Sequence, residues 1–308
     1  MQNIKTINID DKDYPENLKR LKKAPKQIYA IGNIELLNKE NLKIAIVGAR
    51  KNTEYGKNMG LNFAKKLSSK GIIIISGLAS GIDSYAHIGA MTEKSKTIAV
   101  LPCGLQKIYP KENQKLYEVI IKNGGLVITE YYKDIEADSS KFTERNRIVA
   151  GLSNGVLVVE GDYRSGTRNT VKIAKELNLP IFCIPSNLES KKGYVPNLII
   201  KNGGNLVTNE NDIIGKIKNI ESPKKEKKTK FEDNIENLFY KMYNIEKRIK
   251  SNYKIYEYIT NNPIDVDELI QKTNMDIKQI NYEITMLTIE EKIKELPGQK
   301  YVKINRLE

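Results

Sequence analysis

The chain has 308 residues, of which 40% are apolar and 29% are charged, and this composition excludes a wholly disordered protein. No apolar run approaches the roughly 20 residues that a membrane-spanning helix needs, so a transmembrane protein is excluded as well. The N-terminus lacks the apolar stretch of a signal peptide. We therefore expect a cytoplasmic protein that has no membrane partner.

The net charge of +13 is unevenly distributed along the chain. Residues 44–220 contain 25 basic and 16 acidic residues, a net charge of +9, whereas residues 251–308 contain 8 and 10, a net charge of −2. Such an excess of positive charge favours a polyanionic partner, nucleic acid above all. A lysine-rich surface that only interacts with solvent would give the same total, so charge alone leaves both interpretations open.

Two cysteines, Cys103 and Cys183, cannot form a disulfide framework or a four-cysteine zinc site. Both lie in or beside apolar runs, where a small buried thiol is expected. The single histidine, His87, excludes most zinc hydrolases and any Ser-His-Asp triad that is not built around it. It follows Asp83 by four residues on a predicted helix, and we expect this pair to fix a loop rather than to perform acid–base chemistry.

From residue 44 onward, short apolar runs alternate with helical periodicity. The predicted strands cover residues 43–48, 72–77, 97–101, 126–129, 156–159 and 181–184. The helices recognised between them cover residues 59–67, 80–93 and 167–178. Continuous apolar runs are typical of buried parallel strands, and strands that alternate with helices form a right-handed sheet covered on both faces. We predict a Rossmann-like, doubly wound parallel α/β sheet for residues 44–218.

The pattern changes after this domain. Residues 219–250 are predicted to form a charged linker, because the run at 223–230 is too charged to be buried, with a short helix at 233–248. Residues 251–308 show three short helical patterns and then a β-hairpin at 292–304, which is the order of a small winged-helix domain. Its third helix offers only Lys278 as a cation, so we interpret this domain as a protein-contact module rather than the main DNA-binding element.

Glycines follow several of the predicted strands, at the edge where open α/β sheets bind ligands. Glycine lets the backbone approach a phosphate, and N–H groups at the start of the next helix bind it. The candidate phosphate-binding positions are Gly48, Gly77, Gly81, Ser165 and Gly166. None of these loops is a Gly-x-Gly-x-x-Gly fingerprint or a Walker A sequence, and tight strand-to-helix turns would explain each glycine by itself.

Cations gather in the same loops and in the run at residues 141–147, where an aromatic residue lies among them. Guanidinium groups pair with phosphate oxygens, and interleaved aromatic residues suit the bases of single-stranded nucleic acid. We expect DNA contacts from Arg50, Lys51, Lys111, Arg145, Arg147, Arg164 and Arg168. The alternative for Arg145 and Arg147 is a structural role, for Arg147 an ion pair with Glu130 or Glu160. Those two carboxylates could instead hold a nucleotide ribose.

Several long motifs carry a family resemblance. Residues 76–90 match SGLAxGIDxxAHxGAL, residues 47–50 match VGSR with Ala for Ser, and residues 142–153 match FPxRNRIIxGLS. Residues 103–113 are similar to GxGLDxxYPxxN, and residues 297–301 to a C-terminal PGxxY. In this order they resemble the DprA/Smf family, the DNA-processing proteins of natural transformation. The resemblance also implies that residues 1–43 form a short N-terminal extension that packs on the core.

Three positions depart from the family pattern. Lys141 stands where a histidine is usual, and residues 185–187 read Pro-Ser-Asn in place of PGS. In the segment at 165–170, Arg168 adds a cation where the family has SGxLIT. These changes alter the detail of the pocket and leave its expected cations in place.

The resemblance implies a protein that is not an enzyme. Members bind single-stranded DNA, self-associate through the Rossmann domain, protect incoming DNA and load the RecA recombinase onto it during natural transformation, in competent cells. The implied partners are therefore single-stranded DNA, RecA and a second copy in a homodimer, with no cofactor and no metal. By position, Arg50 and Lys111 would contact DNA phosphates, and Arg145 and Arg147 would lie in or behind the same pocket.

Two other functions stay open on the sequence. A Rossmann-like nucleotide-binding enzyme or nucleotide sensor could use the same fold, although no catalytic dyad is recognisable. A transcription regulator could act through the winged helix, and the acidic balance of residues 251–308 argues against this.

Overall fold

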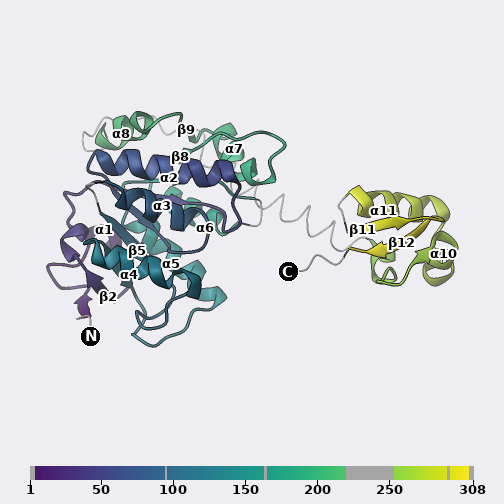
Figure 1. Cartoon of the computed structure of the whole chain (residues 1–308), viewed down its shortest axis with the longest axis horizontal. Coiled ribbons are helices and arrows are strands. Elements are labelled where there is room, and N and C mark those ends of the chain that lie inside the picture. Colours follow the sequence, from purple (N-terminus) through teal and green to yellow (C-terminus); the bar gives the residue numbers. More distant parts are fainter. Residues whose placement is uncertain (1–3, 94–95, 163–164, 220–252, 290–291, 305–308) are drawn as a thin grey trace. The chain divides into compact units, whose positions relative to one another are not determined.

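The computed structural model describes residues 4–93, 96–162, 165–219, 253–289 and 292–304. The chain divides into two compact units, Met1–Ile235 and Glu236–Glu308, and each is considered by itself (Figure 1). The helix predicted at 233–248 lies outside the described residues. The domain limits predicted at residues 43, 218 and 250 stay predictions.

A nine-stranded sheet forms the centre of the first unit, in the order β1-β2-β6-β5-β4-β3-β7-β8-β9. Its strands are β1 (Lys5–Asn8), β2 (Gln27–Gly32), β3 (Lys43–Val47), β4 (Ile73–Ser76), β5 (Thr97–Val100), β6 (Leu126–Thr129), β7 (Gly155–Val158), β8 (Ile181–Cys183) and β9 (Asn205–Leu206). From β6 to β9 all neighbouring strands are parallel. The predicted Rossmann-like α/β fold is therefore confirmed.

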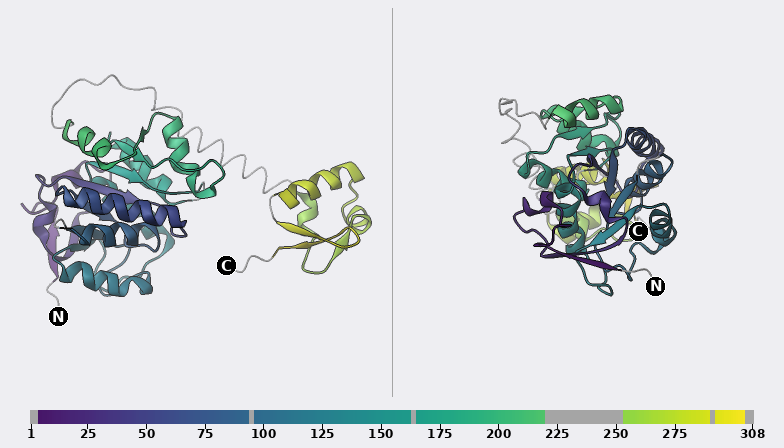
Figure 2. Two further views of the ribbon diagram at one scale, coloured as in Figure 1. Left: turned by 45° about the horizontal axis from the view of Figure 1, so that its top comes forward. Right: turned by 90° about the vertical axis from the view of Figure 1, so that its left-hand side faces the viewer.

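Helices cover both faces of this sheet (Figures 1 and 2). They are α1 (Glu16–Lys19), α2 (Glu54–Ser69), α3 (Ile82–Met91), α4 (Gln114–Lys122), α5 (Ser139–Gly151), α6 (Thr167–Glu176), α7 (Tyr194–Lys201) and α8 (Glu210–Asn219). Helices α2, α3, α4 and α8 pack on one face. The connections from β3 to β6 proceed across the sheet in one direction, and the connections from β6 to β7 and from β7 to β8 proceed in the other. Because all are right-handed, α5 and α6 lie on the other face, and α1 contacts α5 there. No helix of the described residues is long and apolar enough to span a bilayer.

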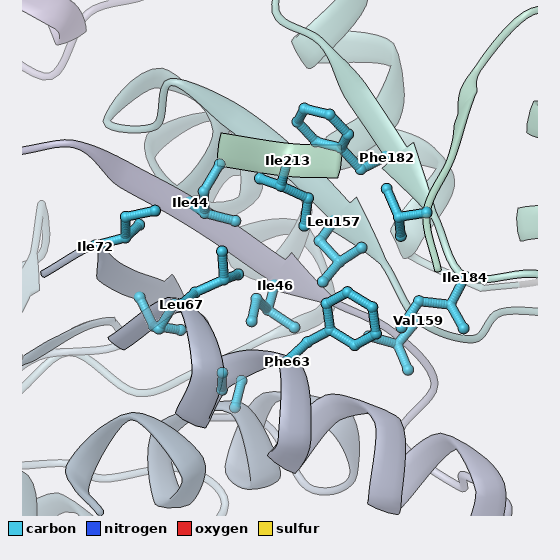
Figure 3. Close-up of a cluster of buried hydrophobic side chains, with 14 of the residues drawn as sticks. Ile44, Ile46, Phe63, Leu67, Ile72, Leu157, Val159, Phe182, Ile184 and Ile213 are labelled. Atoms are coloured by element: carbon cyan, nitrogen blue, oxygen red, sulfur yellow. The ribbon is translucent and has the colours of Figure 1, made fainter. Parts of the chain in front are cut away.

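The main hydrophobic core lies between the sheet and α2 (Figure 3). Ile44 and Ile46 of β3 meet Phe63 and Leu67, which α2 presents four residues apart on one side. Phe182 of β8 is fully buried in the same cluster, and α8 closes it from the outside. This core fixes the loop after β3 relative to the loops after β7 and β8.

The N-terminal segment adds two strands to the edge of the sheet. Strand β1 pairs antiparallel with β2, and β2 pairs antiparallel with β6, so residues 5–32 lengthen the sheet itself. The apolar side chains of Ile28, Ala30 and Ile31 are buried there. No helical pattern beside these short strands helps to predict them from the sequence. Their position is fixed by the pairing of β2 with the edge of β6.

The second unit has the winged-helix order. It contains η4 (Lys254–Glu257), β10 (Ile264–Asp265), α10 (Val266–Thr273), α11 (Ile277–Ile289), β11 (Ile293–Leu296) and β12 (Lys300–Lys303), with sheet order β10-β12-β11. The first predicted helix is only a 3-10 turn, because Pro263 and two asparagines follow it closely. Its backbone N–H at Ile255 donates to the buried carboxylate of Glu283.

Removal of the Phe182 ring should destabilise the first unit strongly. Phe182→Ala deletes a fully buried ring of the main core, so we expect the free energy of unfolding to fall by about 3–5 kcal/mol. Urea denaturation followed by circular dichroism measures this loss. Leu188→Ala is the control, since Leu188 is 92% exposed, and equal shifts in both variants would contradict the assignment of the core.

Candidate functional site

A pocket of about 470 Å³ opens at the carboxyl ends of the central strands. Its lining comes from the end of β3 and the loop after it, from α5, and from the loop that leads from β7 into α6. Strand order reverses between β3 and β7, because the chain proceeds to one side from β3 and to the other from β7. Open α/β sheets bind ligands at such a switch point.

Two glycines allow the loops around the pocket to approach each other. Gly81 has a φ of +82°, and a Cβ there would clash with the carbonyl oxygens of Ala49 and Arg50. A Cβ on Gly77 would clash with the guanidinium of Arg145. The predicted phosphate-binding role of these glycines stays a prediction, but their packing role explains why glycine is present. A Cβ at Gly166 would meet open space.

Arg50 lies on the exposed rim of the pocket. Its guanidinium carbon is 4.4 Å from the centroid of the Phe142 ring, and Phe142 contacts Tyr109 edge to face at 5.4 Å between centroids. The cation–π contact limits the orientations of the guanidinium without neutralising it. Tyr109 is 45% exposed, so this row combines a positive charge with an accessible aromatic surface.

Lys51 and Lys111 are also exposed at this edge of the sheet. Lys51 lines the pocket beside Arg50. Lys111 begins the 3-10 turn η2 (Lys111–Asn113), and the amide of Asn113 donates to the carbonyl oxygen of Leu78 at 2.8 Å. The loop after β5 is thereby held next to the loop after β4, which places the lysine at the same edge.

Arg145 is buried behind the pocket, with 3% of its surface exposed. Its Nη1 donates to the carbonyl oxygens of Gly77 and Val100 at the ends of β4 and β5. Burial lowers its pKa to about 10, and the opposing attraction comes mainly from Asp83, so the group stays charged at neutral pH. The carboxylate of Asp83 accepts the N–H of Gly77 at 3.1 Å.

Arg147 forms an ion pair inside the domain. Its Nη2 lies 2.5 Å from Oε2 of Glu130, and the two side chains are 18% and 13% exposed. Of the two partners considered for a structural Arg147, the structure therefore has Glu130. Both Arg145 and Arg147 have the geometry of residues that position the site, and direct DNA contact by either stays a prediction.

Glu160 is fully buried beneath the loop after β3. Its carboxylate accepts the backbone N–H of Thr53 at 2.9 Å and the hydroxyl of Thr53 at 2.5 Å. Thr53 is the N-cap of α2, so the carboxylate also lies near the positive end of that helix. Because Glu160 and Glu130 both have partners within the protein, the geometry does not favour the ribose role considered for them.

The start of α6 forms the opposite wall of the pocket. Ser165 accepts the N–H of Thr167 at 3.2 Å, and Asn169 ties α6 to α5 by donating to the carbonyl oxygen of Thr143 at 2.8 Å. Ser165 and Gly166 line the pocket, whereas Arg168 is partly exposed on the helix. The predicted DNA contact Arg164 lies outside the described residues.

Lys192 lines the pocket, and the sequence analysis missed it. It lies 2.7 Å from the carboxylate of Asp162, which follows β7. Lys192 itself comes shortly after the carboxyl end of β8. The rule that selected the other cations, a basic residue after a strand, would have found it.

His87 does not form its hydrogen bond with Asp83. Its Nδ1 lies 2.7 Å from the hydroxyl of Thr97, and this hydroxyl donates to the carbonyl oxygen of Ile74 at 2.7 Å. The Thr97 hydroxyl must therefore accept a hydrogen bond from Nδ1–H of His87. Burial, and secondarily Arg145, lowers the pKa of His87 to about 3, so the imidazole is neutral. The pair fixes α3 against β5 and β4 instead of fixing a loop.

The two cysteines are buried, as predicted. Burial raises the pKa of Cys103 to about 11 and also raises the pKa of Cys183. Both thiols are therefore protonated at neutral pH and are poor nucleophiles.

Comparison with known proteins identifies the family. The model of the family described as DNA recombination-mediator protein A matches residues 5–218. The chain belongs to this family. It is 37% identical over 212 residues to DNA processing protein DprA of Bacillus subtilis, covering 69% of this chain and 71% of that protein. It is 35% identical over 208 residues to Protein Smf of Escherichia coli, covering 68% of this chain but only 55% of that relative.

Solved structures of DprA proteins share the fold of this family member. The X-ray structure of DprA from Streptococcus pneumoniae aligns with a TM-score of 0.66 at 34% identity, over 70% of this chain and 74% of that one. A structure of DprA from Helicobacter pylori that concerns its single-stranded DNA binding mode aligns with a TM-score of 0.62 at 30% identity, over 71% and 99%. The predicted DprA/Smf membership is thus confirmed, and the family match ends before the winged helix.

The buried His87 should make the stability of this DprA/Smf-family chain depend on pH. Its folded pKa of about 3 lies below the ordinary 6.5, so as pH falls through 6.5 only the unfolded chain gains a proton. Relative to His87→Gln, we expect the free energy of unfolding to fall with a slope that steepens from about 0.7 kcal/mol per pH unit at pH 6.5 to about 1.4 near pH 5. Urea titrations at several pH values measure both slopes, and equal slopes would contradict the assignment.

Proposed function

We propose that this chain is a recombination mediator that binds single-stranded DNA at the pocket lined by the loop after β3, α5 and the start of α6. The row formed by Arg50, Phe142 and Tyr109 carries the proposal. It offers a cation to a phosphate and an accessible ring to a base, the combination that single-stranded nucleic acid requires. The single-stranded DNA binding mode described for the Helicobacter pylori relative supports the same assignment.

The cations divide into two groups by exposure. Arg50, Lys51 and Lys111 are exposed and are proposed to contact phosphates, with Ser165 and Gly166 offering backbone groups at the start of α6. Arg145 and Arg147 are proposed to act through the loops that they hold. The buried charge of Arg145 adds positive potential beneath the pocket, where water screens it less than it would at the surface.

The function is proposed to be binding rather than catalysis. A nucleotide-handling enzyme would need a carboxylate free to act on a ribose or a phosphate, and both candidates, Glu130 and Glu160, have partners inside the domain. Competition by a mononucleotide distinguishes the two functions, since an enzyme or sensor pocket would be saturated by it.

Loss of the Arg50 side chain should weaken binding of a single strand. Arg50→Ala removes a charge-assisted phosphate contact worth roughly 1.5–3 kcal/mol, so we expect the Kd for a 30-nucleotide strand to rise about tenfold or more. The slope of log K against log salt should decrease by about 0.7, because one fewer counterion is released. Fluorescence anisotropy across a salt series, without ATP or metal, measures both quantities.

The control for this experiment is Lys39→Ala. Lys39 is also exposed but precedes β3, so it lies at the opposite edge of the sheet from the pocket. Its removal should leave the Kd unchanged. Equal losses in the two variants, or full displacement of the strand by a mononucleotide, would reject the proposed site.

We further propose that the chain protects incoming DNA and loads RecA onto it during natural transformation, as a homodimer. These roles beyond DNA binding follow from the family resemblance. Sedimentation equilibrium tests the dimer, which should have twice the mass of one chain.

Loading of RecA should depend on the pocket. On a single strand coated with single-strand-binding protein, addition of the wild-type chain should shorten the lag before RecA hydrolyses ATP. Arg50→Ala, which holds the strand less tightly, should restore most of the lag, whereas Lys39→Ala should not. A lag that the wild-type chain leaves unchanged would contradict RecA loading and leave DNA binding unaffected.

A further inference from the structure

A second pocket, of about 450 Å³, opens between the start of α2 and the loop after β8. The described residues that line it are Thr53, Tyr55, Pro185, Ser186, Asn187 and Ser190. Thr53 follows Lys51 of the first pocket by two residues, and Ser190 precedes Lys192 of that pocket by two. Cα atoms two residues apart are separated by at most about 7 Å. The two pockets are therefore neighbours that share both loops.

Charge distinguishes the two pockets. The described residues that line the first pocket have a net charge of +2, from four cations and two carboxylates: Arg50, Lys51, Arg145 and Lys192, with Asp83 and Asp162. The six residues of the second pocket are all uncharged, and they offer an aromatic ring, hydroxyls and an amide. The first set attracts a phosphate, whereas the second suits a neutral base with an aromatic face and a polar edge. The volume of the second pocket is also within the range of small-molecule sites, roughly 300–1,000 Å³.

The ring of Tyr55 forms a fixed wall of the second pocket. It is 43% exposed, and its hydroxyl donates to the carbonyl oxygen of Pro185 at 2.8 Å. Its backbone belongs to the first turn of α2, whose N-cap Thr53 is held by the buried carboxylate of Glu160. A ring that is exposed but anchored at both ends loses little conformational freedom when a base stacks on it.

The loop after β8 supplies the polar groups. The backbone N–H and carbonyl oxygen of Ser186 are both bonded to the side-chain amide of Asn197 in α7, at 3.0 and 2.8 Å. The side-chain oxygen of Asn187 accepts the N–H of Glu189 at 3.0 Å, so its NH₂ group is the part that can donate to a ligand. Within the described part of the chain, neither this NH₂ group nor the Ser186 hydroxyl has a hydrogen-bond partner. Both are therefore available to the edge of a base.

The same two side chains mark a departure of this chain from the family pattern. Residues 185–187 read Pro-Ser-Asn where the pattern has Pro-Gly-Ser. Gly193 provides the space for the added side chain, since a Cβ there would lie 2.6 Å from Oγ of Ser186. The polar edge of the second pocket is thus a feature of this sequence and not of the family pattern.

We infer that the second pocket holds one base of a single strand whose neighbouring phosphates occupy the first pocket. The base stacks on the ring of Tyr55, and its polar edge binds the hydroxyl of Ser186 and the NH₂ group of Asn187. This inference rests on the proposed function and adds to it a subsite for a base. Because the subsite has no charge, its share of the affinity depends on the bases of the strand and not on salt.

The experiment compares two 30-nucleotide single strands, one of thymidine and one whose bases are all absent. Both carry the same phosphates, so the difference in Kd isolates the contacts to bases. The full chain is titrated by fluorescence anisotropy across a salt series as wild type, Arg50→Ala, Tyr55→Ala, Tyr55→Phe and S186G/N187S. The last variant introduces the residues of the family pattern. Tyr258→Ala is the control, since Tyr258 is 41% exposed and belongs to the second unit.

We expect Tyr55→Ala to raise the Kd for the thymidine strand roughly tenfold, as the loss of one stacked base requires. The Kd for the abasic strand and both salt slopes should not change, because the ring has no charge. Tyr55→Phe keeps the ring and should recover most of the affinity. S186G/N187S should raise the Kd for the thymidine strand about threefold, as the loss of a neutral hydrogen bond does, and leave the abasic strand unaffected.

The two remaining variants separate this inference from the proposed function. Tyr258→Ala should bind both strands like wild type. Arg50→Ala should weaken both strands and lower both salt slopes, because both strands carry the phosphate that Arg50 contacts.

Other results would overturn the inference. If Tyr55→Ala binds both strands like wild type while Arg50→Ala weakens both, the first pocket stands and the second holds no base. If Tyr55→Ala weakens both strands equally, its ring supports the loop that carries Arg50 instead of stacking on a base. An equal loss in Tyr258→Ala would reject the assignment to this pocket, and wild-type binding by S186G/N187S would reject the polar contacts. If Arg50→Ala changes neither strand, the proposed function itself fails.

Discussion

The site depends on one buried positive charge, that of Arg145. The guanidinium of Arg145 binds the carbonyl oxygens at the ends of β4 and β5, and Asp83 lies near enough to favour its charged form. A buried charge is tolerated best when hydrogen-bond acceptors and a counter-charge are close to it. These contacts align the ends of two parallel strands, and the loops after them can then form the pocket floor. Gly77 is a glycine because the guanidinium occupies the space of a side chain.

The arginines at this edge of the sheet therefore have two different structural roles. Arg145 and Arg147 use their donors on carbonyls and a carboxylate inside the protein, whereas Arg50 keeps its charge at the surface against an aromatic ring. The first role sets the shape of the pocket, and the second leaves a positive charge accessible at its rim.

The sheet topology explains why the contacts converge. Crossovers of one hand that proceed in opposite directions from β3 and β7 leave a gap at the switch point, which the loops after the strands and the start of α6 surround. The same topology brings the end of α6 to the N-terminal segment, where Lys22 meets Glu176.

By itself the sequence determined the α/β class, most of the parallel strands, the winged-helix order and the family, because apolar periodicity and motif spacing are local properties of the chain. It also indicated which loops carry cations. Only the tertiary structure decided which cations face solvent. Arg145 lies three residues after Phe142 in the same cationic run, yet it is buried because its guanidinium binds Gly77, 68 residues away in the sequence. The pairing of His87 with Thr97, of Glu160 with Thr53 and of β2 with β6 likewise depends on partners distant in the sequence. Burial is decided by long-range packing, which local spacing does not record.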